Sequence, residues 1–310
     1  DMSHIRMYNE YFPPYKAAID AGAGSIMASF NEIDGVPATA NKWLLTEVLR
    51  NQWGFKGFVV SDYTGVSEMI AHGIGDLQTV SARALDAGLD MDMVSEGLLT
   101  TLKKSVDEGK ITEQQITEAC RRVLKAKFQL GLFDDPYRYC SEERAKSEVF
   151  TATNRAEARK AATESFVLLK NDNVLPLKKS GTIAVIGPMA NTRENMTGTW
   201  SVAARFSESI SVMDGLTKAV GNSAKLVYAR GSNLHEDAAI EERATMFGKS
   251  LNRDKRSAEE MRSEAVRIAR AADVIVAVVG EGAEMSGEAS SVTNLELPQT
   301  QRELLKALLQ

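Results

Sequence analysis

Short, continuously apolar runs separated by helix-like segments limit what this chain can fold into. Residues 183–187 and 274–280 contain only Val, Ile and Ala before a closing glycine. Strands covered by helices on both faces have this composition, whereas a strand with one wet face alternates apolar and polar residues. Because such runs recur between helical segments, the sequence predicts an α/β fold with parallel sheets.

The first part of the chain alternates helix and strand signals. Strand signals lie at residues 25–30, 57–62 and 89–93. The helical segments between them end at Gly54 and Gly88, where a glycine is the usual helix stop. We place this first domain at residues 1–135.

A polar, turn-rich stretch at residues 136–153 is predicted to be a linker. Before it, Thr112 and Gln115 have the spacing of a capping box, which predicts a helix that runs to about Leu130. The second domain then covers residues 154–310.

The second domain has its own helix and strand signals. We expect a helix at residues 155–169 and another after Pro298. The expected strands are residues 182–187, 224–229 and 273–280. Residues 237–263 are charged and helix-prone, and are predicted to form a solvated excursion.

Composition excludes several classes of protein. The net charge of −5 disfavours nucleic-acid binding, which needs clustered Lys and Arg. No apolar run reaches the roughly 18–20 residues that cross a bilayer, so we expect no membrane span. The two cysteines, Cys120 and Cys140, are expected to be free thiols, and no ligand spacing indicates a metal site.

Asp62 is the first candidate for catalysis. It ends the apolar strand signal at residues 57–62, and catalytic side chains of βα barrels gather at that end of the strands. The alternative is an aspartate that only caps the next helix. The strand signal by itself does not decide between them.

Glu288 is the second candidate. It lies in a glycine-spaced acidic loop that follows the strand signal at residues 273–280. Ligands of open α/β sheets bind beyond the carboxyl ends of the strands. Glu281 and Glu284 share this loop, and a solvated acidic loop without function is the alternative. Two carboxyl groups in one pocket suit the cleavage of a glycosidic bond.

Five sequence blocks together resemble glycoside hydrolase family 3, in particular its bacterial periplasmic β-glucosidase branch. The blocks occur in the family's order and span nearly the whole chain. They are FNEIDGVPA at 30–38, WGFKGFVVSDY at 53–63, AGLDMDM at 87–93, SFVLLKN at 165–171 with LPL at 175–177, and SGEASS at 286–291.

The resemblance implies a fold and two catalytic roles. The fold is the C-terminal part of a (β/α)8 TIM-type barrel followed by an incomplete α/β/α sandwich domain. The resemblance makes Asp62 the nucleophile and Glu288 the acid/base. A nucleophilic carboxylate must be ionised, whereas a general acid must hold its proton near the working pH.

Five further residues are candidates for substrate binding. Tyr63 follows the nucleophile and either flanks the sugar or packs. Phe30 occupies a place where some relatives carry Tyr, so its expected role is shape. Met27 and Met93 either border the pocket floor or belong to the core, and Trp200 either stacks on an aglycone or packs.

The resemblance also implies what is missing. The strand signals of the first domain resemble the sixth, seventh and eighth of the eight barrel strands. The relatives' Lys-His pair and the Arg and Asp that bind the glycone lie on earlier strands. We therefore expect a central fragment that is neither stable nor active alone.

The implied activity is that of a retaining, exo-acting β-glucosidase. It would hydrolyse terminal non-reducing β-D-glucosyl residues by double displacement, with a β-linked glucoside or oligosaccharide as substrate and without a cofactor. A glycoside phosphorylase, a β-xylosidase and an inactive sugar-binding fragment remain as alternatives. The resemblance is compatible with a homodimer and implies a periplasmic or secreted location, although the printed sequence shows no signal peptide.

Overall fold

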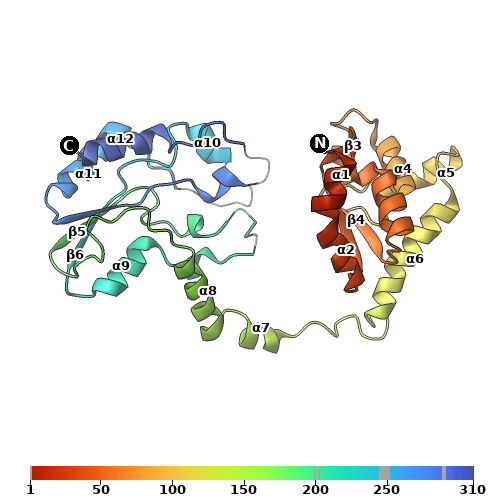
Figure 1. Cartoon of the computed structure of the whole chain (residues 1–310), viewed down its shortest axis with the longest axis horizontal. Helices are drawn as coiled ribbons and strands as arrows, with labels where there is room; N and C mark the ends of the chain where they lie inside the picture. Colours follow the sequence, from red (N-terminus) through yellow and green to blue (C-terminus); the bar gives the residue numbers. More distant parts are fainter. Residues whose placement is uncertain (1, 199, 202, 244–251, 288–290) are drawn as a thin grey trace. The chain divides into compact units, whose positions relative to one another are not determined.

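The chain contains two compact units, residues 1–165 and 166–310. The computed structural model describes residues 2–198, 200–201, 203–243, 252–287 and 291–310. The helices and strands are labelled in Figure 1, and each unit is described by itself.

Unit 1 alternates strands with helices, as the sequence predicts. Its strands are β1 Ser25–Ala28, β2 Glu32–Ile33, β3 Val36–Pro37 and β4 Phe58–Ser61. Its helical segments are α1 His4–Arg6, η1 Met7–Tyr11, α2 Phe12–Asp20, η2 Ala38–Ala40, η3 Trp43–Gln52, α3 Gly65–Glu68, α4 Leu77–Ala87, α5 Gly97–Asp107, α6 Glu113–Gln129, α7 Glu142–Glu148 and α8 Ala152–Glu164.

The strands β1 and β4 form a parallel pair with Ala28 beside Ser61. The predicted third strand, residues 89–93, is reduced to one bridge between Val60 and Met91. The expectation of a regular strand there is therefore wrong. Residues 91–93 still lie beside the end of β4, because Met91 O and Met93 O accept the backbone N–H groups of Ser61 and Thr64.

The core of unit 1 lies between this small sheet and its helices. Val59 on β4 and Leu89 are completely buried against Val80 and Ala84 of α4. The helix α4 begins where Asp76 accepts a hydrogen bond from the Thr79 backbone N–H. It ends at Gly88, whose φ of 115° suits a glycine.

A buried carboxylate ties three elements of unit 1 together. The side chain of Asp90 is completely buried and accepts hydrogen bonds from Arg50 at 2.6 Å, Arg122 at 2.7 Å and the Val59 backbone N–H at 2.8 Å. Burial lowers the pKa of Arg50, an effect that the charge of Asp90 opposes. The residues come from η3, α6 and β4, so one carboxylate connects both helices to the strand.

The opposite face of the sheet carries apolar side chains that no helix in the described part of unit 1 covers. Met27 and Met91 are 52% and 46% exposed. The strand register places Met27 beside Val60, and Val60 bridges Met91, so the three residues share one face.

The last helices of unit 1 confirm one prediction and contradict another. Thr112 and Gln115 form the predicted capping box at the start of α6. The helix expected over residues 155–169 ends at Glu164, and residues 166–169 are non-helical and exposed. Four consecutive apolar residues do not fit a helical period, and α8 buries no residue that would hold its end in place.

Unit 2 is built around a three-stranded parallel sheet. Its strands are β5 Thr182–Ile186, β6 Lys225–Ala229 and β7 Val274–Ala277, in the order β6-β5-β7. Its helical segments are η4 Glu194–Met196, η5 Phe206–Glu208, α9 Val212–Val220, α10 Ala238–Arg243, α11 Ala258–Ala269, η6 Ala283–Ser286 and α12 Gln299–Leu308.

Helices cover both faces of this sheet (Figure 1). On one face, Val220 of α9 packs with Ile183 and Val185. On the other face, Ala265 of α11 and Leu304 of α12 pack with the remaining side chains of β5 and β6. The prediction of strands with two covered faces is confirmed for β5, whose last four residues are all buried.

The prediction is wrong for β7. This strand is at the edge of the sheet, and Ile275 and Ala277 are exposed while Val274 and Val276 are half-buried. The register places Ile275 beside Ala184, on the face that α11 and α12 cover over the other strands. An apolar run therefore identified the strand, but not whether helices reach its second face.

Most described side chains of the segment 237–263 are exposed, as predicted. Glu241 of α10 is an exception, since it is buried and pairs with Arg253. Met261, on α11, is also buried and belongs to the core. The helices α10 and α11 agree with the helical tendency of the sequence, and residues 244–251 lie outside the described part of the chain.

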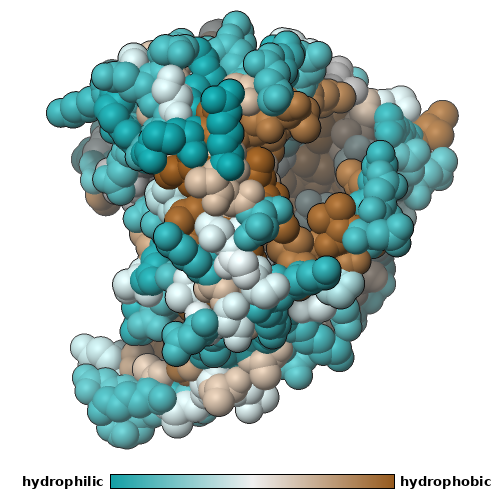
Figure 2. Space-filling model, turned by 90° about the vertical axis from the view of Figure 1, so that its left-hand side faces the viewer, coloured by the Kyte–Doolittle hydropathy of each residue, from teal (hydrophilic) through white to brown (hydrophobic). Residues whose placement is uncertain are grey.

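Within the described residues, no helix has the length and apolar character needed to cross a membrane. Apolar side chains do reach the surface, and Figure 2 shows a face where they gather. The apolar residues 166–169, for example, are each at least 67% exposed.

We predict that Asp90→Ala lowers the free energy of unfolding by about 3–5 kcal/mol, because it leaves two guanidinium groups and a backbone N–H without a buried acceptor. Urea unfolding measures the change. Asp86→Ala is the matched control, since Asp86 pairs with Lys42 near the surface and its loss should cost about 1 kcal/mol or less. Equal effects of the two substitutions would contradict the structural role of Asp90.

We predict that Asp254 stabilises unit 2 only above acidic pH. Hydrogen bonds from the Arg256 side chain and backbone N–H lower the pKa of Asp254 from 3.8 to about 2. A lowered pKa means that the stabilisation is complete above about pH 4 and disappears as the pH falls through about 2. The difference in unfolding free energy between the wild type and Asp254→Asn should shrink over this interval, and a constant difference would be inconsistent with this role.

Candidate active site

Asp62 lies directly after β4, at the carboxyl end of the β1–β4 pair. Its backbone N–H donates to Ala28 O at 3.1 Å, which extends the ladder by one residue. Its side chain is half-buried, and its Oδ1 accepts the Tyr63 backbone N–H at 2.6 Å. The helix-cap alternative does not apply, because the residue that caps α3 is Thr64.

Ser61 fixes the strand end that carries Asp62. Its buried hydroxyl donates to Asp62 O at 2.8 Å and accepts the Met93 backbone N–H at 2.8 Å. The Ser61 backbone N–H donates to Met91 O, and the Thr64 N–H donates to Met93 O. The strand end is thus tied on one side to β1 and on the other to residues 91–93.

The predicted binding residues of unit 1 surround this strand end. Phe30 is half-buried and its ring lies against Gly65, where an added Cβ would be 3.7 Å from the ring. Tyr63 is 60% exposed. Met93 is half-buried, and Met27 lies on the uncovered face of the sheet rather than in the core.

In the part of the chain that the structure describes, no Lys or Arg forms an ion pair with Asp62. Because side chains alternate along a strand, Asp62 shares the face of Val60 and therefore of Met27 and Met91. A polar ligand at Asp62 would meet an apolar floor on this face.

Unit 2 has an open hollow of about 610 Å³ beyond the carboxyl ends of its strands. Residues 195–198, 200–201, 281–283 and 287 line it. These residues come from η4 and the loop after it, and from the loop that follows β7. The hollow lies where a parallel sheet usually binds ligands.

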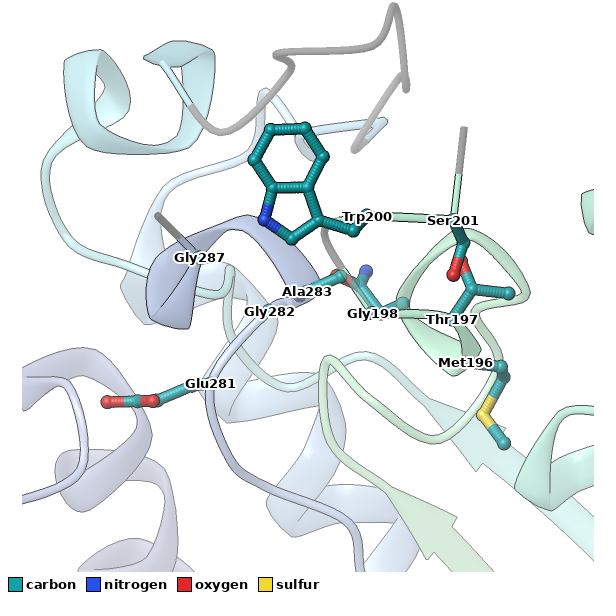
Figure 3. Close-up of a pocket in the computed structure, with 10 residues that line it drawn as sticks. Met196, Thr197, Gly198, Trp200, Ser201, Glu281, Gly282, Ala283 and Gly287 are labelled. Carbon is teal, nitrogen blue, oxygen red and sulfur yellow. The ribbon is translucent and has the colours of Figure 1, made fainter. Parts of the chain in front are cut away.

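Trp200 and Glu281 both line this hollow but face different ways. Trp200 is 60% exposed, and Figure 3 shows its indole ring on the side of η6. The carboxylate of Glu281 points away from the indole in the same view. Glu288, the predicted acid/base, lies outside the described residues.

The loop after β7 is held by two amide side chains that the sequence analysis missed. Gln301 bonds the backbone of Gly280, and Asn195 bonds the backbone N–H of Ala283. The sequence offered one signal for Gln301, because this amide lies on the same side of its helix as the apolar Leu304. In the structure, both side chains are completely buried. No comparable sequence signal distinguishes Asn195.

Metal binding has no structural support in the described ranges. No group of three or more His, Cys, Asp and Glu side chains there is arranged to hold an ion. Cys120 and Cys140 are exposed free thiols, as predicted.

Comparison with known proteins identifies the family. Residues 1–126 match the glycosyl hydrolase family 3 N-terminal domain, and residues 166–310 match the family's C-terminal domain. This chain belongs to glycosyl hydrolase family 3. Its mixed α/β fold is similar to that of solved family 3 β-glucosidases.

Three relatives illustrate the similarity. The periplasmic beta-glucosidase of Salmonella typhimurium is 44% identical over 99% of this chain and 41% of its own length. A beta-xylosidase of Formosa agariphila is 35% identical over 99% of this chain and 42% of its own length. The beta-glucosidase of Listeria innocua crystallised with glucose is 35% identical, with a TM-score of 0.79, over 99% of this chain and 39% of its own.

A mutant of the Listeria innocua enzyme was also crystallised with laminaribiose, and it is 34% identical with a TM-score of 0.80. This family 3 chain spans about two fifths of the length of these relatives. Residues outside the matched portion therefore contribute to the relatives' structures.

Proposed function

We propose that this family 3 chain forms part of a retaining, exo-acting β-glucosidase. The observation that carries the proposal is the 44% identity to a periplasmic beta-glucosidase across 99% of the chain. The solved relatives with glucose and laminaribiose support a β-linked glucoside as the substrate. The similarity to the periplasmic beta-glucosidase also supports a periplasmic or secreted location.

The proposed architecture is the C-terminal part of a (β/α)8 barrel followed by an α/β/α sandwich domain. The parallel β1–β4 pair with its covering helices supports the barrel part. The β6-β5-β7 sheet between α9 and the pair α11 and α12 supports the sandwich. The linker between them is proposed at residues 136–153.

Asp62 is the proposed nucleophile. Its place at the carboxyl end of a barrel strand supports this role, as does its half-buried carboxylate with an N–H donor at Oδ1. The ladder bond to Ala28 and the hydroxyl of Ser61 hold the backbone from which it attacks. A nucleophile needs such fixed geometry because small misplacements are costly.

Glu288 is the proposed acid/base. Asp62 would attack the anomeric carbon while Glu288 gives its proton to the departing glycosidic oxygen. Glu288 would then take a proton from the water that cleaves the glycosyl–enzyme bond, so the acid is regenerated. Two displacements retain the configuration, which requires the carboxyl groups to lie about 5–5.5 Å apart.

The remaining candidates are proposed to shape the sugar site. Tyr63 would flank the sugar, and Phe30 would support the turn behind the nucleophile by packing on Gly65. Met27 and Met93 would form the apolar floor. Trp200, an exposed aromatic beside a hollow, would stack on an aglycone.

A β-xylosidase is the second candidate. It is favoured by the relative of that name, which is 35% identical over 99% of the chain. Comparing kcat/KM for aryl β-glucosides and aryl β-xylosides distinguishes the two. We expect the glucoside to be preferred, and a preference for the xyloside would replace the first proposal by the second.

We predict that Asp62→Ala abolishes release of nitrophenol from an aryl β-glucoside by the full-length protein, because no glycosyl–enzyme forms. Azide should restore turnover and yield an α-glycosyl azide, since it attacks the face that Asp62 vacates. Asp86→Ala, at an exposed ion pair, should retain activity. Unchanged turnover in Asp62→Ala would refute the nucleophile assignment.

We predict that Glu288→Gln lowers kcat/KM about 10²–10⁴-fold for glucosides with poor leaving groups, because these need proton donation. The loss should be much smaller for dinitrophenyl glucosides, whose leaving group departs unprotonated. Glu281→Gln tests the competing carboxylate and should have little effect. Equal losses on both kinds of substrate in Glu288→Gln would count against the acid role.

A further inference from the structure

The loop after β7 begins at a backbone position that a buried side chain holds. Gln301 of α12 is completely buried. Its Oε1 accepts the Gly280 backbone N–H at 2.9 Å, and its Nε2 donates to Gly280 O at 2.9 Å and to Leu234 O at 2.7 Å. The amide thus bonds both backbone groups of one glycine and ties it to a second loop.

Packing alone does not account for an amide at this position. Gln301 neighbours the buried Leu304 on α12, and a leucine there would fill a similar volume without the cost of burying polar atoms. A leucine side chain forms no hydrogen bonds, so it would leave the Gly280 N–H and the carbonyls of Gly280 and Leu234 without these partners. The contribution of Gln301 is therefore to fix where the backbone lies.

A second amide holds the same loop three residues later. The Oδ1 of Asn195, on η4, accepts the Ala283 backbone N–H at 2.9 Å, and its Nδ2 donates to Thr192 Oγ1 at 3.0 Å. An added Cβ at Gly282 would lie 3.0 Å from Asn195 Oδ1 and 3.2 Å from Leu234 Cδ1. The loop therefore passes close to both side chains.

These contacts fix the segment from Gly280 to Ala283 at both ends, and Glu288 follows five residues later in the sequence. Five residues reach at most about 17 Å, so a shift of their anchor moves the accessible positions of the carboxylate. A misplacement of about 1 Å at a reacting group can cost on the order of 10²-fold in rate.

We infer that Gln301 and Asn195 are positioning residues for proton donation by Glu288. They act by holding the backbone of the loop that carries the acid, and Asn195 also lines the hollow of unit 2. The inference rests on the proposed function, since it needs Glu288 to be the acid/base.

The test must separate positioning from stability. Loss of folded enzyme lowers kcat/KM equally for every substrate, whereas a misplaced acid lowers it only where proton donation is needed. The quantity to measure is the ratio of kcat/KM for a dinitrophenyl glucoside to that for an alkyl glucoside. We use kcat/KM because it reports the first displacement and excludes the later step in which Glu288 acts as a base.

The variants are Gln301→Leu and Asn195→Ala in the full-length protein. Each should raise this ratio by roughly 10–10²-fold relative to the wild type. Gln299→Leu is the control for Gln301→Leu, because Gln299 is an exposed glutamine on the same helix. Asn195→Asp keeps an oxygen that accepts the Ala283 N–H and should restore most of the wild-type ratio.

An unchanged ratio in Asn195→Ala and Gln301→Leu, with equal losses on both substrates, would overturn the inference and leave the proposed function standing. If Gln301→Leu does not fold, Asn195→Ala and its Asp counterpart decide the matter. If Glu288→Gln itself leaves the ratio unchanged, the proposed acid fails and the inference fails with it.

Discussion

The buried carboxylate of Asp90 is the interaction on which the first unit depends. It takes hydrogen bonds from Arg50, Arg122 and the Val59 backbone, and so connects η3, α6 and β4. A buried charge is tolerated only when its partners are in place. The strand β4, which ends one residue before Asp62, is therefore fixed by the buried charge of Asp90 as well as by its pairing with β1.

In the second unit, an uncharged side chain has a similar structural role. Among the strands that the structure describes, β7 pairs with β5 alone, so the backbone beyond its end receives sheet hydrogen bonds from one side. Gln301 supplies further hydrogen bonds to Gly280 from α12. In both units, a buried polar side chain forms hydrogen bonds with the backbone of the segment that leads to a proposed catalytic carboxylate.

The sequence predicted the elements with strong local signals. The apolar runs of β5 and β7, the capping box of α6 and the strand that leads to Asp62 follow from periodicity and turn chemistry. The helix over residues 155–169 was predicted too long, because propensity does not show whether an apolar face has a partner. Residues 89–93 form one bridge rather than a regular strand, because backbone pairing depends on the neighbouring chain and not on local apolar character alone.

Long-range contacts limit how much of the candidate site could be predicted from the sequence. The pairing of Asn195 with Ala283 joins residues that are 88 positions apart, and nothing in the local sequence encodes it. Gln301 was the easier of the two to predict, since an amide in the apolar stripe of a helix needs buried partners. The motif blocks identified the family because the five blocks were compared together. This comparison does not depend on knowing the long-range contacts.

The close passage of Gly282 between Asn195 and Leu234 also bears on engineering of the hollow in unit 2. Side chains cannot be added there without moving neighbours, whereas Trp200 at the rim of the hollow is exposed and Ser201 is half-buried. Mutant libraries built on the rim would sample new ligand contacts and keep the anchor intact. Most substitutions of Gly282 would misplace the loop.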